Sequence, residues 1–137
     1  MICGLDTSIV LRLLTGEPRE LALRVVNRVM AITRSGGLCT VSDLVATESY
    51  YALQHHYKLP KAEALSTLAA LGAGDGIRFS EAAGAVLRTQ GLAQANPGFA
   101  DRLIHAGYRQ SGHGMLTCER AAASLEGVEV IKENAPS

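Results

Sequence analysis

The sequence has no excess of charge of either sign. Thirteen lysine and arginine residues are balanced by thirteen aspartate and glutamate residues, so the formal net charge is zero. The chain therefore has no global basic signal for nucleic acid, and any phosphate contact depends on a local basic rim or on a metal ion.

Cysteine motifs are also lacking. The three cysteines are odd in number, and no CxxC or Cys/His spacing indicates a zinc site. Because Cys3, Cys39 and Cys118 lie in or beside expected strands, we expect buried, reduced thiols.

Long apolar runs are missing as well. No run approaches the ~20 residues of a membrane span, and Asp6 and Arg12 interrupt the apolar start where a signal peptide would need continuity. We expect a cytoplasmic protein that does not associate with membranes.

Since 47% of the 137 residues are hydrophobic, we expect one folded domain over residues 1–132 and a polar tail at 133–137.

Short β-rich runs alternate with helical patterns along the whole chain. Such alternation predicts an α/β fold with a mainly parallel sheet and helices on both faces. Ser42 and Ser80 are expected to cap helices, and Pro18 is placed to open one. The expected strands are 2–5, 38–41, 77–79, 115–117 and 128–131, and the expected helices are 9–15, 18–34, 43–57, 62–71, 81–91, 99–109 and 119–125.

The first expected strand ends at an acidic residue. The apolar run Ile2 to Leu5 stops at Asp6, and Thr7 leads directly into an amphipathic stretch. In an open α/β sheet, ligands bind beyond the carboxyl ends of the strands. Asp6 is therefore a candidate site residue.

A second acid, Glu48, falls within an apolar helical stripe that includes Leu44 and Tyr51. We expect this stripe to face the core. A buried carboxylate is costly unless it is paired, protonated or bound to a cation, so Glu48 predicts either an ion pair with an arginine or a metal site.

Two further carboxylates stand at comparable points of the chain. Asp101 lies in the first turn of a helix, and Glu119 follows the strand that ends at Thr117. Because the carboxyl ends of parallel strands share one edge, Asp6 and Glu119 are expected to approach each other if their strands are neighbours. Clustered carboxylates repel unless a cation compensates, and Mg²⁺ or Mn²⁺ prefers such oxygen ligands.

Four segments together resemble the signature segments of PIN-domain ribonucleases, and most closely those of VapC toxins from bacterial toxin–antitoxin pairs. They are Leu5–Val10, Val41–Glu48, Gly98–Ile104 and Leu116–Arg120, in the family's order. The resemblance implies a three-layer α/β/α sandwich with a central, mainly parallel sheet of four to five strands. It also implies hydrolysis of RNA phosphodiesters by a Mg²⁺- or Mn²⁺-dependent endonuclease.

By motif position, the resemblance assigns catalytic and metal-binding roles to Asp6, Glu48, Asp101 and Glu119. The last of these stands where the family usually has Asp, and Gly98 stands where many relatives carry an additional Asp. The extra methylene of Glu119 displaces its carboxylate by over an ångström, about the scale at which a metal site fails. The alternative is a PIN-like domain that has lost catalysis and binds RNA or protein.

Several residues beside the acids are candidates for substrate binding. Thr7, Thr117, Arg102, Arg120 and His105 flank the four carboxylates, and for each an ordinary structural or surface role is an open alternative.

The resemblance further implies a small antitoxin partner and a homodimer. A haloacid-dehalogenase-type phosphatase is disfavoured because Ser8 stands where a second Asp is needed. No GxGxxG follows the first strand, so dinucleotide binding is not indicated.

Overall fold

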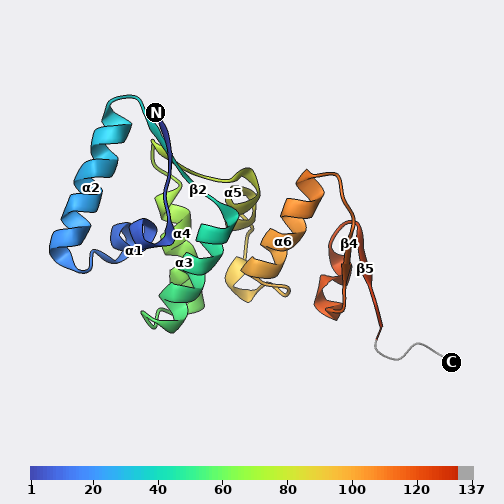
Figure 1. Cartoon of the computed structure of the whole chain (residues 1–137). Coiled ribbons are helices and arrows are strands. Elements are labelled where there is room, and N and C mark those ends of the chain that lie inside the picture. Colours follow the sequence, from blue (N-terminus) through green and yellow to red (C-terminus); the bar gives the residue numbers. More distant parts are fainter. Residues whose placement is uncertain (133–137) are drawn as a thin grey trace.

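We describe a computed structural model of the protein over residues 1–132, so the tail predicted at 133–137 lies outside the described residues (Figure 1). Strands and helices alternate as the sequence predicts. In chain order the elements are β1 Ile2–Gly4, α1 Thr7–Thr15, α2 Arg19–Arg34, β2 Leu38–Val41, α3 Asp43–His55, α4 Lys61–Leu71, β3 Ile77–Phe79, α5 Glu81–Leu87, η1 Leu92–Gln94, α6 Phe99–Gln110, β4 Met115–Thr117, η2 Arg120–Ser124 and β5 Val128–Val130.

Local signals set the starts of several helices. The Ser42 hydroxyl accepts a hydrogen bond from the backbone N–H of Val45, and the Ser80 hydroxyl accepts one from Ala83, so both predicted caps are confirmed. Pro18 directly precedes α2, as expected. Two expected helices differ: the one at 81–91 ends at Leu87, and the last one, at 119–125, does not form an α-helix. Its run of small residues forms only the 3₁₀ turn η2.

The strands form two separate parallel sheets in the described part of the chain. Three strands pair in the order β1-β2-β3, with Ile2 opposite Leu38 and Cys39 opposite Ile77, while β4 pairs only with β5. The prediction of one sheet with four to five strands is therefore wrong, although the mixed α/β class is confirmed. Local patterns locate strands but do not determine which distant strands pair.

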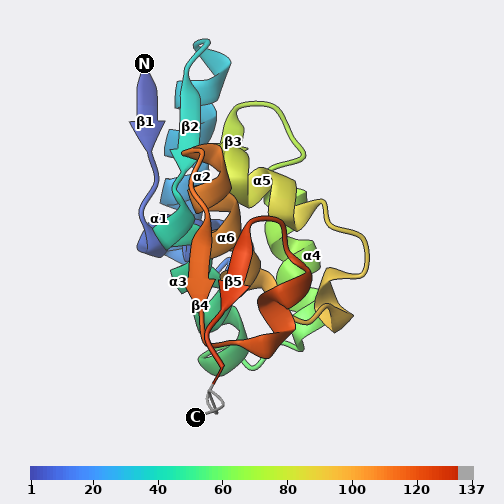
Figure 2. The same cartoon turned by 90° about the vertical axis from the view of Figure 1, so that its right-hand side faces the viewer.

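The β4–β5 unit stands apart from the main sheet. Figure 1 shows α3 and α6 lying between β1 and this unit, and Figure 2, which views the molecule from the side of the unit, shows it in front of α6. A hydrogen bond from the His105 ring to the Glu126 carbonyl (2.7 Å) and an ion pair between Arg109 and Glu126 (3.1 Å) join the unit to α6.

The core lies between the main sheet and the helices from α1 to α6. The Tyr50 and Phe99 rings meet edge to face, with centroids 5.0 Å apart, and so anchor the start of α6 to α3. The largest of the fully buried side chains come from α1, β2, α3 and α4, and they are Val10, Cys39, Val41, Ser49, Leu53 and Leu68.

Helix α3 is rotated relative to the face that the sequence predicts. Leu44 is 69% exposed, Tyr51 is 44% exposed and Glu48 is exposed, so the predicted burial of this stripe is wrong. The core-facing residues are Ala46, Ser49, Tyr50 and Leu53 instead. Both sides of α3 carry apolar side chains, and the pattern alone did not distinguish the covered side from the open one.

The cysteines are free thiols in three different environments. Cys39 is buried, Cys3 is half-buried, and Cys118 is exposed, so the expectation of burial is wrong for Cys118. Burial raises the pKa of the Cys39 thiol, and the nearby Cys3 thiol adds to this effect.

None of the helices described over residues 1–132 has the length and apolar character to cross a membrane.

Candidate functional site

Asp6 lies just beyond the carboxyl end of β1 and caps α1. Its Oδ1 accepts hydrogen bonds from the Ser8 hydroxyl at 2.7 Å and from the Ile9 backbone N–H at 3.1 Å. The Ser8 bond, followed by the Ile9 bond, lowers the pKa of Asp6 below its ordinary value of 3.8. The exposed carboxylate is therefore ionised at neutral pH.

Glu48 lies on α3 and is held beside the same strand end. The Thr7 hydroxyl donates a hydrogen bond to its Oε1 at 2.7 Å. Because Thr7 directly follows Asp6 in the chain, its bond to Glu48, 41 positions further on, links the two acids. The structure thus brings together the first pair of carboxylates that the sequence singles out.

Asp101 and Glu119 form a second pair. Both line a pocket of about 210 Å³ between α6 and β4, together with Thr117. The Thr117 hydroxyl accepts a hydrogen bond from the Glu119 backbone N–H at 3.0 Å and so orders the turn that follows β4. The pocket also contains Ile104 and Tyr108, which share a helical face with Asp101 as the spacing predicts.

The two pairs do not meet within one chain. Over residues 1–132, there is no group of three or more His, Cys, Asp or Glu side chains that could hold a metal ion. The expected convergence of all four acids in one pocket is therefore not seen in this arrangement. The reason is the position of the β4–β5 unit, which carries Glu119 away from the edge where Asp6 lies (Figure 1).

Over residues 1–132, no arginine forms an ion pair with any of these four acids. Within the described part of the chain, the ion pair found is that of Arg109 with Glu126, which involves none of the four carboxylates. The structure therefore does not contain the arginine pairing that was the structural alternative for Glu48. Its carboxylate is exposed and accepts one hydrogen bond from a hydroxyl group.

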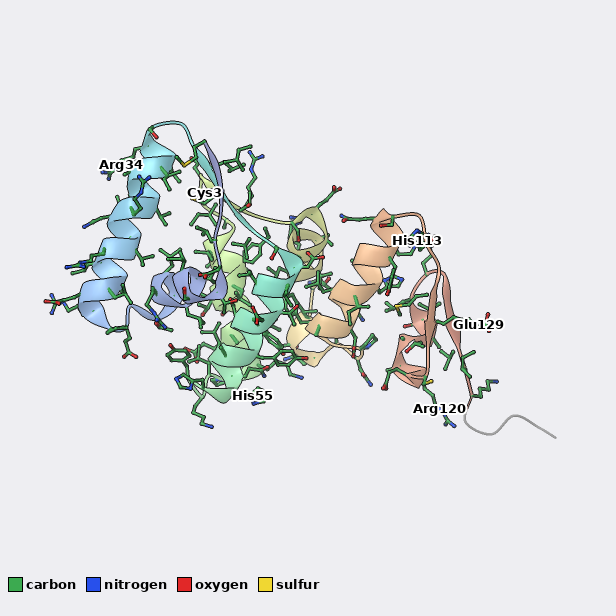
Figure 3. The ribbon with its side chains drawn as sticks, in the orientation of Figure 1. Cys3, Arg34, His55, His113, Arg120 and Glu129 are labelled. Carbon is green, nitrogen blue, oxygen red and sulfur yellow. The ribbon has the colours of Figure 1, made fainter. Side chains whose placement is uncertain are left out.

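Two of the three basic candidates for substrate binding have structural partners. The Arg102 Nε donates to the Pro97 carbonyl at 2.7 Å, and the His105 ring contacts the Glu126 carbonyl. Arg120 is exposed at the end of the β4–β5 unit, where Figure 3 shows its side chain projecting away from α6. Of the basic candidates, Arg120 is thus the one most available to a phosphate.

The sequence reasoning missed Asp43. This residue follows β2 by two positions, and its carboxylate accepts a short hydrogen bond from the Ser80 hydroxyl, which follows β3. Its place at the carboxyl end of a strand was the available signal. Asp43 also lines an open groove of about 540 Å³ between α3 and α6, whose other walls include Leu44, Leu103 and Ile104.

Comparison with known proteins returns no match for this chain among protein-family models, curated proteins or solved structures.

Proposed function

We propose that this protein is a Mg²⁺- or Mn²⁺-dependent endoribonuclease of the PIN type, acting as the toxin of a VapC-like toxin–antitoxin pair. The observation that carries the proposal is the arrangement of Asp6, Thr7 and Glu48. Two exposed carboxylates from distant segments are held together at the carboxyl edge of a parallel sheet, which is where α/β proteins bind their ligands.

The donor set fits a hard divalent cation. Asp6 and Glu48 each use one described oxygen for a hydrogen bond, which leaves the second carboxylate oxygen for a ligand. Mg²⁺ is commonly held by one or two carboxylates while it keeps several waters. Asp6 and Glu48 would hold the ion, and Asp101 and Glu119, which form a separate pair in this arrangement, are proposed as further acidic ligands.

The roles of the chain's own groups follow from their contacts. Ser8 and the Ile9 N–H keep Asp6 charged, while Thr7 fixes the orientation of Glu48. Arg120 is the candidate contact for an RNA phosphate. When bound, a divalent cation supplies a Lewis acid that activates water and offsets the charge developing on the scissile phosphate.

An exposed apolar strip on α2 supports the proposed antitoxin partner. Leu23 and Met30, seven residues apart on one face of the helix, are 53% and 36% exposed, and the opposite face packs into the core. A small partner that covers this strip would remove apolar surface from water. The proposal also includes the PIN-like sandwich as the complete fold and the cytoplasm as the place of action.

The test is cleavage of a panel of RNAs by the purified protein with added Mn²⁺ or Mg²⁺. We expect endonucleolytic products that disappear with EDTA and in Asp6→Asn. The matched control is Glu63→Gln, which removes one exposed carboxylate from α4 and leaves the acidic pairs intact. Cleavage that resists EDTA, or that is lost equally in Glu63→Gln, would contradict the proposal.

A binding module without catalysis is the second candidate. The observation that favours it is the separation of the two acidic pairs, since no group of three possible metal ligands forms in residues 1–132. A module of this kind would bind RNA equally with and without Mn²⁺ and would be indifferent to Asp6→Asn. RNA binding measured in the same samples as cleavage separates the two candidates.

A further inference from the structure

One face of α3 is open to solvent and carries a proposed metal-binding acid near its middle. Four exposed residues, at spacings of three and four positions, form one row along the helix: Leu44, Glu48, Tyr51 and His55. The opposite face packs into the core. The exposed row therefore forms a surface that extends from Glu48 toward the end of the helix.

Tyr51 and His55 form a stacked aromatic pair in this row. Their ring planes lie 17° from parallel, and the ring centroids are 6.0 Å apart. Tyr51 is 44% exposed and His55 is exposed as well, so both rings are accessible to a ligand. Figure 3 shows His55 at the lower end of α3. We call the two side chains the Tyr51–His55 platform.

The platform is supported from the core. The ring of Tyr50, which is buried, lies with its centroid 5.3 Å from that of Tyr51 and 5.0 Å from that of the buried Phe99. Because Tyr51 rests on a ring that the core holds in place, it loses little conformational freedom when a ligand binds. The platform is therefore ordered before any ligand arrives.

The charge of the chain changes sign after Glu48. No acidic residue occurs between Glu48 and Glu63, whereas Lys58 and Lys61 lie in this interval and both are exposed. They stand at the turn from α3 to α4, directly beyond the platform. Exposed aromatic rings combined with nearby cations are typical of surfaces that bind single-stranded nucleic acid.

The platform lies within reach of a phosphate at the acidic pair. Tyr51 follows Glu48 by one helical turn, about 4.5 Å along the axis, and His55 follows it by two turns, about 10.5 Å. If a cation at Glu48 holds one phosphate of an RNA strand, the bases of the adjoining nucleotides lie beside the two rings.

We propose that the Tyr51–His55 platform stacks against unpaired RNA bases next to the cleaved phosphate, and that Lys58 and Lys61 contact the phosphates that follow. This binding role rests on the proposed nuclease and specifies its substrate as single-stranded RNA. In a duplex the bases are paired and stacked on one another, so their faces are closed to the platform. Because every base has a π-face, stacking here is tolerant of sequence.

The primary test is the affinity for a labelled single-stranded RNA and for the same RNA as a duplex. Fluorescence anisotropy in EDTA measures both, since the platform and the two lysines need no metal. We expect the single strand to bind more tightly. Tyr51→Leu is expected to weaken its binding by about tenfold, the order of one lost base–aromatic stack.

Matched variants separate the ring from other properties of the side chain. Tyr51→Phe keeps the aromatic face and is expected to bind as wild type does, and His55→Leu and His55→Phe repeat the comparison at the second ring. Leu23→Ala removes an apolar side chain that is 53% exposed on α2 and is expected to have no effect on RNA affinity. Since all three positions are exposed, the fold is retained, and circular dichroism checks this.

Tyrosine fluorescence identifies the residue that touches the bases. The chain has no tryptophan, so the emission of its four tyrosines is observed directly. We expect RNA to quench part of this emission in wild type, because a stacked base quenches the ring that it covers. Tyr51→Phe is expected to bind RNA equally well and to lose that quenching, a result that a purely structural role of Tyr51 does not produce.

Several results would overturn the proposal. They are an absence of RNA binding by wild type in EDTA, equal affinity for single strand and duplex, and a Tyr51→Leu variant that binds as wild type does. The last result would leave a protein partner as the occupant of this face. Equal losses in Tyr51→Phe and Tyr51→Leu would show that the hydroxyl acts and that stacking does not.

Failure of the platform and failure of the proposed nuclease are separately observable. Binding in EDTA requires no catalysis, so a protein without nuclease activity can still show the dependence on Tyr51. Conversely, metal-dependent cleavage that is lost in Asp6→Asn but unchanged in Tyr51→Leu would retain the nuclease and exclude the platform.

Discussion

Thr7 donates a 2.7 Å hydrogen bond to Glu48, which joins the first residue of α1 to the middle of α3. Asp6, the preceding residue, caps α1 through its own carboxylate. The backbone turn from β1 into α1 thus orients one acid directly and a second acid through a hydroxyl group. Glu48 would otherwise be a surface side chain with free rotamers, so Thr7 acts as a positioning residue.

We predict that Thr7→Val separates positioning from stability. The loss of one exposed hydrogen bond lowers the free energy of unfolding by about 1 kcal/mol or less. Misplacement of Glu48 is expected to reduce RNA cleavage by about tenfold or more while RNA binding is retained. The control is Thr15→Val, since the Thr15 hydroxyl bonds only locally, to the Leu11 carbonyl and the Glu17 N–H. Equal loss of activity in both variants would contradict the positioning role.

Asp6 is expected to make stability depend on pH in the acid range. Its pKa is lower in the folded chain than in the unfolded chain because the Ser8 hydroxyl and the Ile9 N–H favour the carboxylate. Its contribution is therefore complete above the ordinary value of 3.8 and is lost as the pH falls through the lower folded value. Urea unfolding at pH 7 and at steps below pH 4 measures the effect.

Two variants separate the contribution of Asp6 as a helix cap from the contribution of its charge. Asn also caps helices well, so Asp6→Asn retains most of the stability at pH 7 and removes the pH dependence. Asp6→Ala loses the cap and costs about 1 kcal/mol at pH 7. A pH profile of Asp6→Asn that matches wild type would show that other groups cause the acid sensitivity.

Ser49 is predicted to be a removable polar group in the core. It is fully buried in α3, and its hydroxyl has no hydrogen-bond partner in the described structure. Because an unsatisfied buried hydroxyl is costly, Ser49→Ala is expected to be neutral or to stabilise the protein by up to about 1 kcal/mol. Chemical unfolding measures this, with Ser66→Ala, at an exposed position of α4, as the control. A loss of more than about 1 kcal/mol would indicate a partner for the hydroxyl.

The sequence was a good guide to local structure. The caps at Ser42 and Ser80 and the short strands were predictable because they depend on neighbouring residues. The position of Asp6 at a strand end was predictable for the same reason. The link between Thr7 and Glu48 was not, since it joins residues 41 positions apart.

Two features depended on information that local patterns do not contain. Leu44 and Tyr51 are apolar enough to suggest a core-facing stripe, yet they are 69% and 44% exposed because α3 presents the face that carries Ser49 and Leu53 to the core. The partner strand of β4 is likewise not determined by local sequence, because the strands with which it could pair lie far apart in the chain.

Gly98 offers a test of the acidic site that adds a group instead of removing one. It is the N-cap of α6, three residues before Asp101, and its backbone angles (φ −86°, ψ −163°) suit any residue. A Cβ at this position meets no atom closer than the Ala95 carbonyl oxygen at 4.0 Å. Both Gly98→Asp and Gly98→Asn should therefore fold and improve the cap by a few tenths of a kcal/mol.

Gly98→Asp adds a negative charge and Gly98→Asn does not, so we expect the two variants to respond differently to a divalent cation. The carboxylate of Gly98→Asp stands beside that of Asp101 and repels it, and a divalent cation relieves the repulsion. We expect Mn²⁺ to raise the melting temperature of Gly98→Asp more than that of wild type, while Gly98→Asn responds as wild type does. Since the resemblance to PIN-domain ribonucleases places an Asp here in many relatives, cleavage should rise with metal affinity. Equal responses of both variants to Mn²⁺ would show that the edge near Asp101 does not bind the cation.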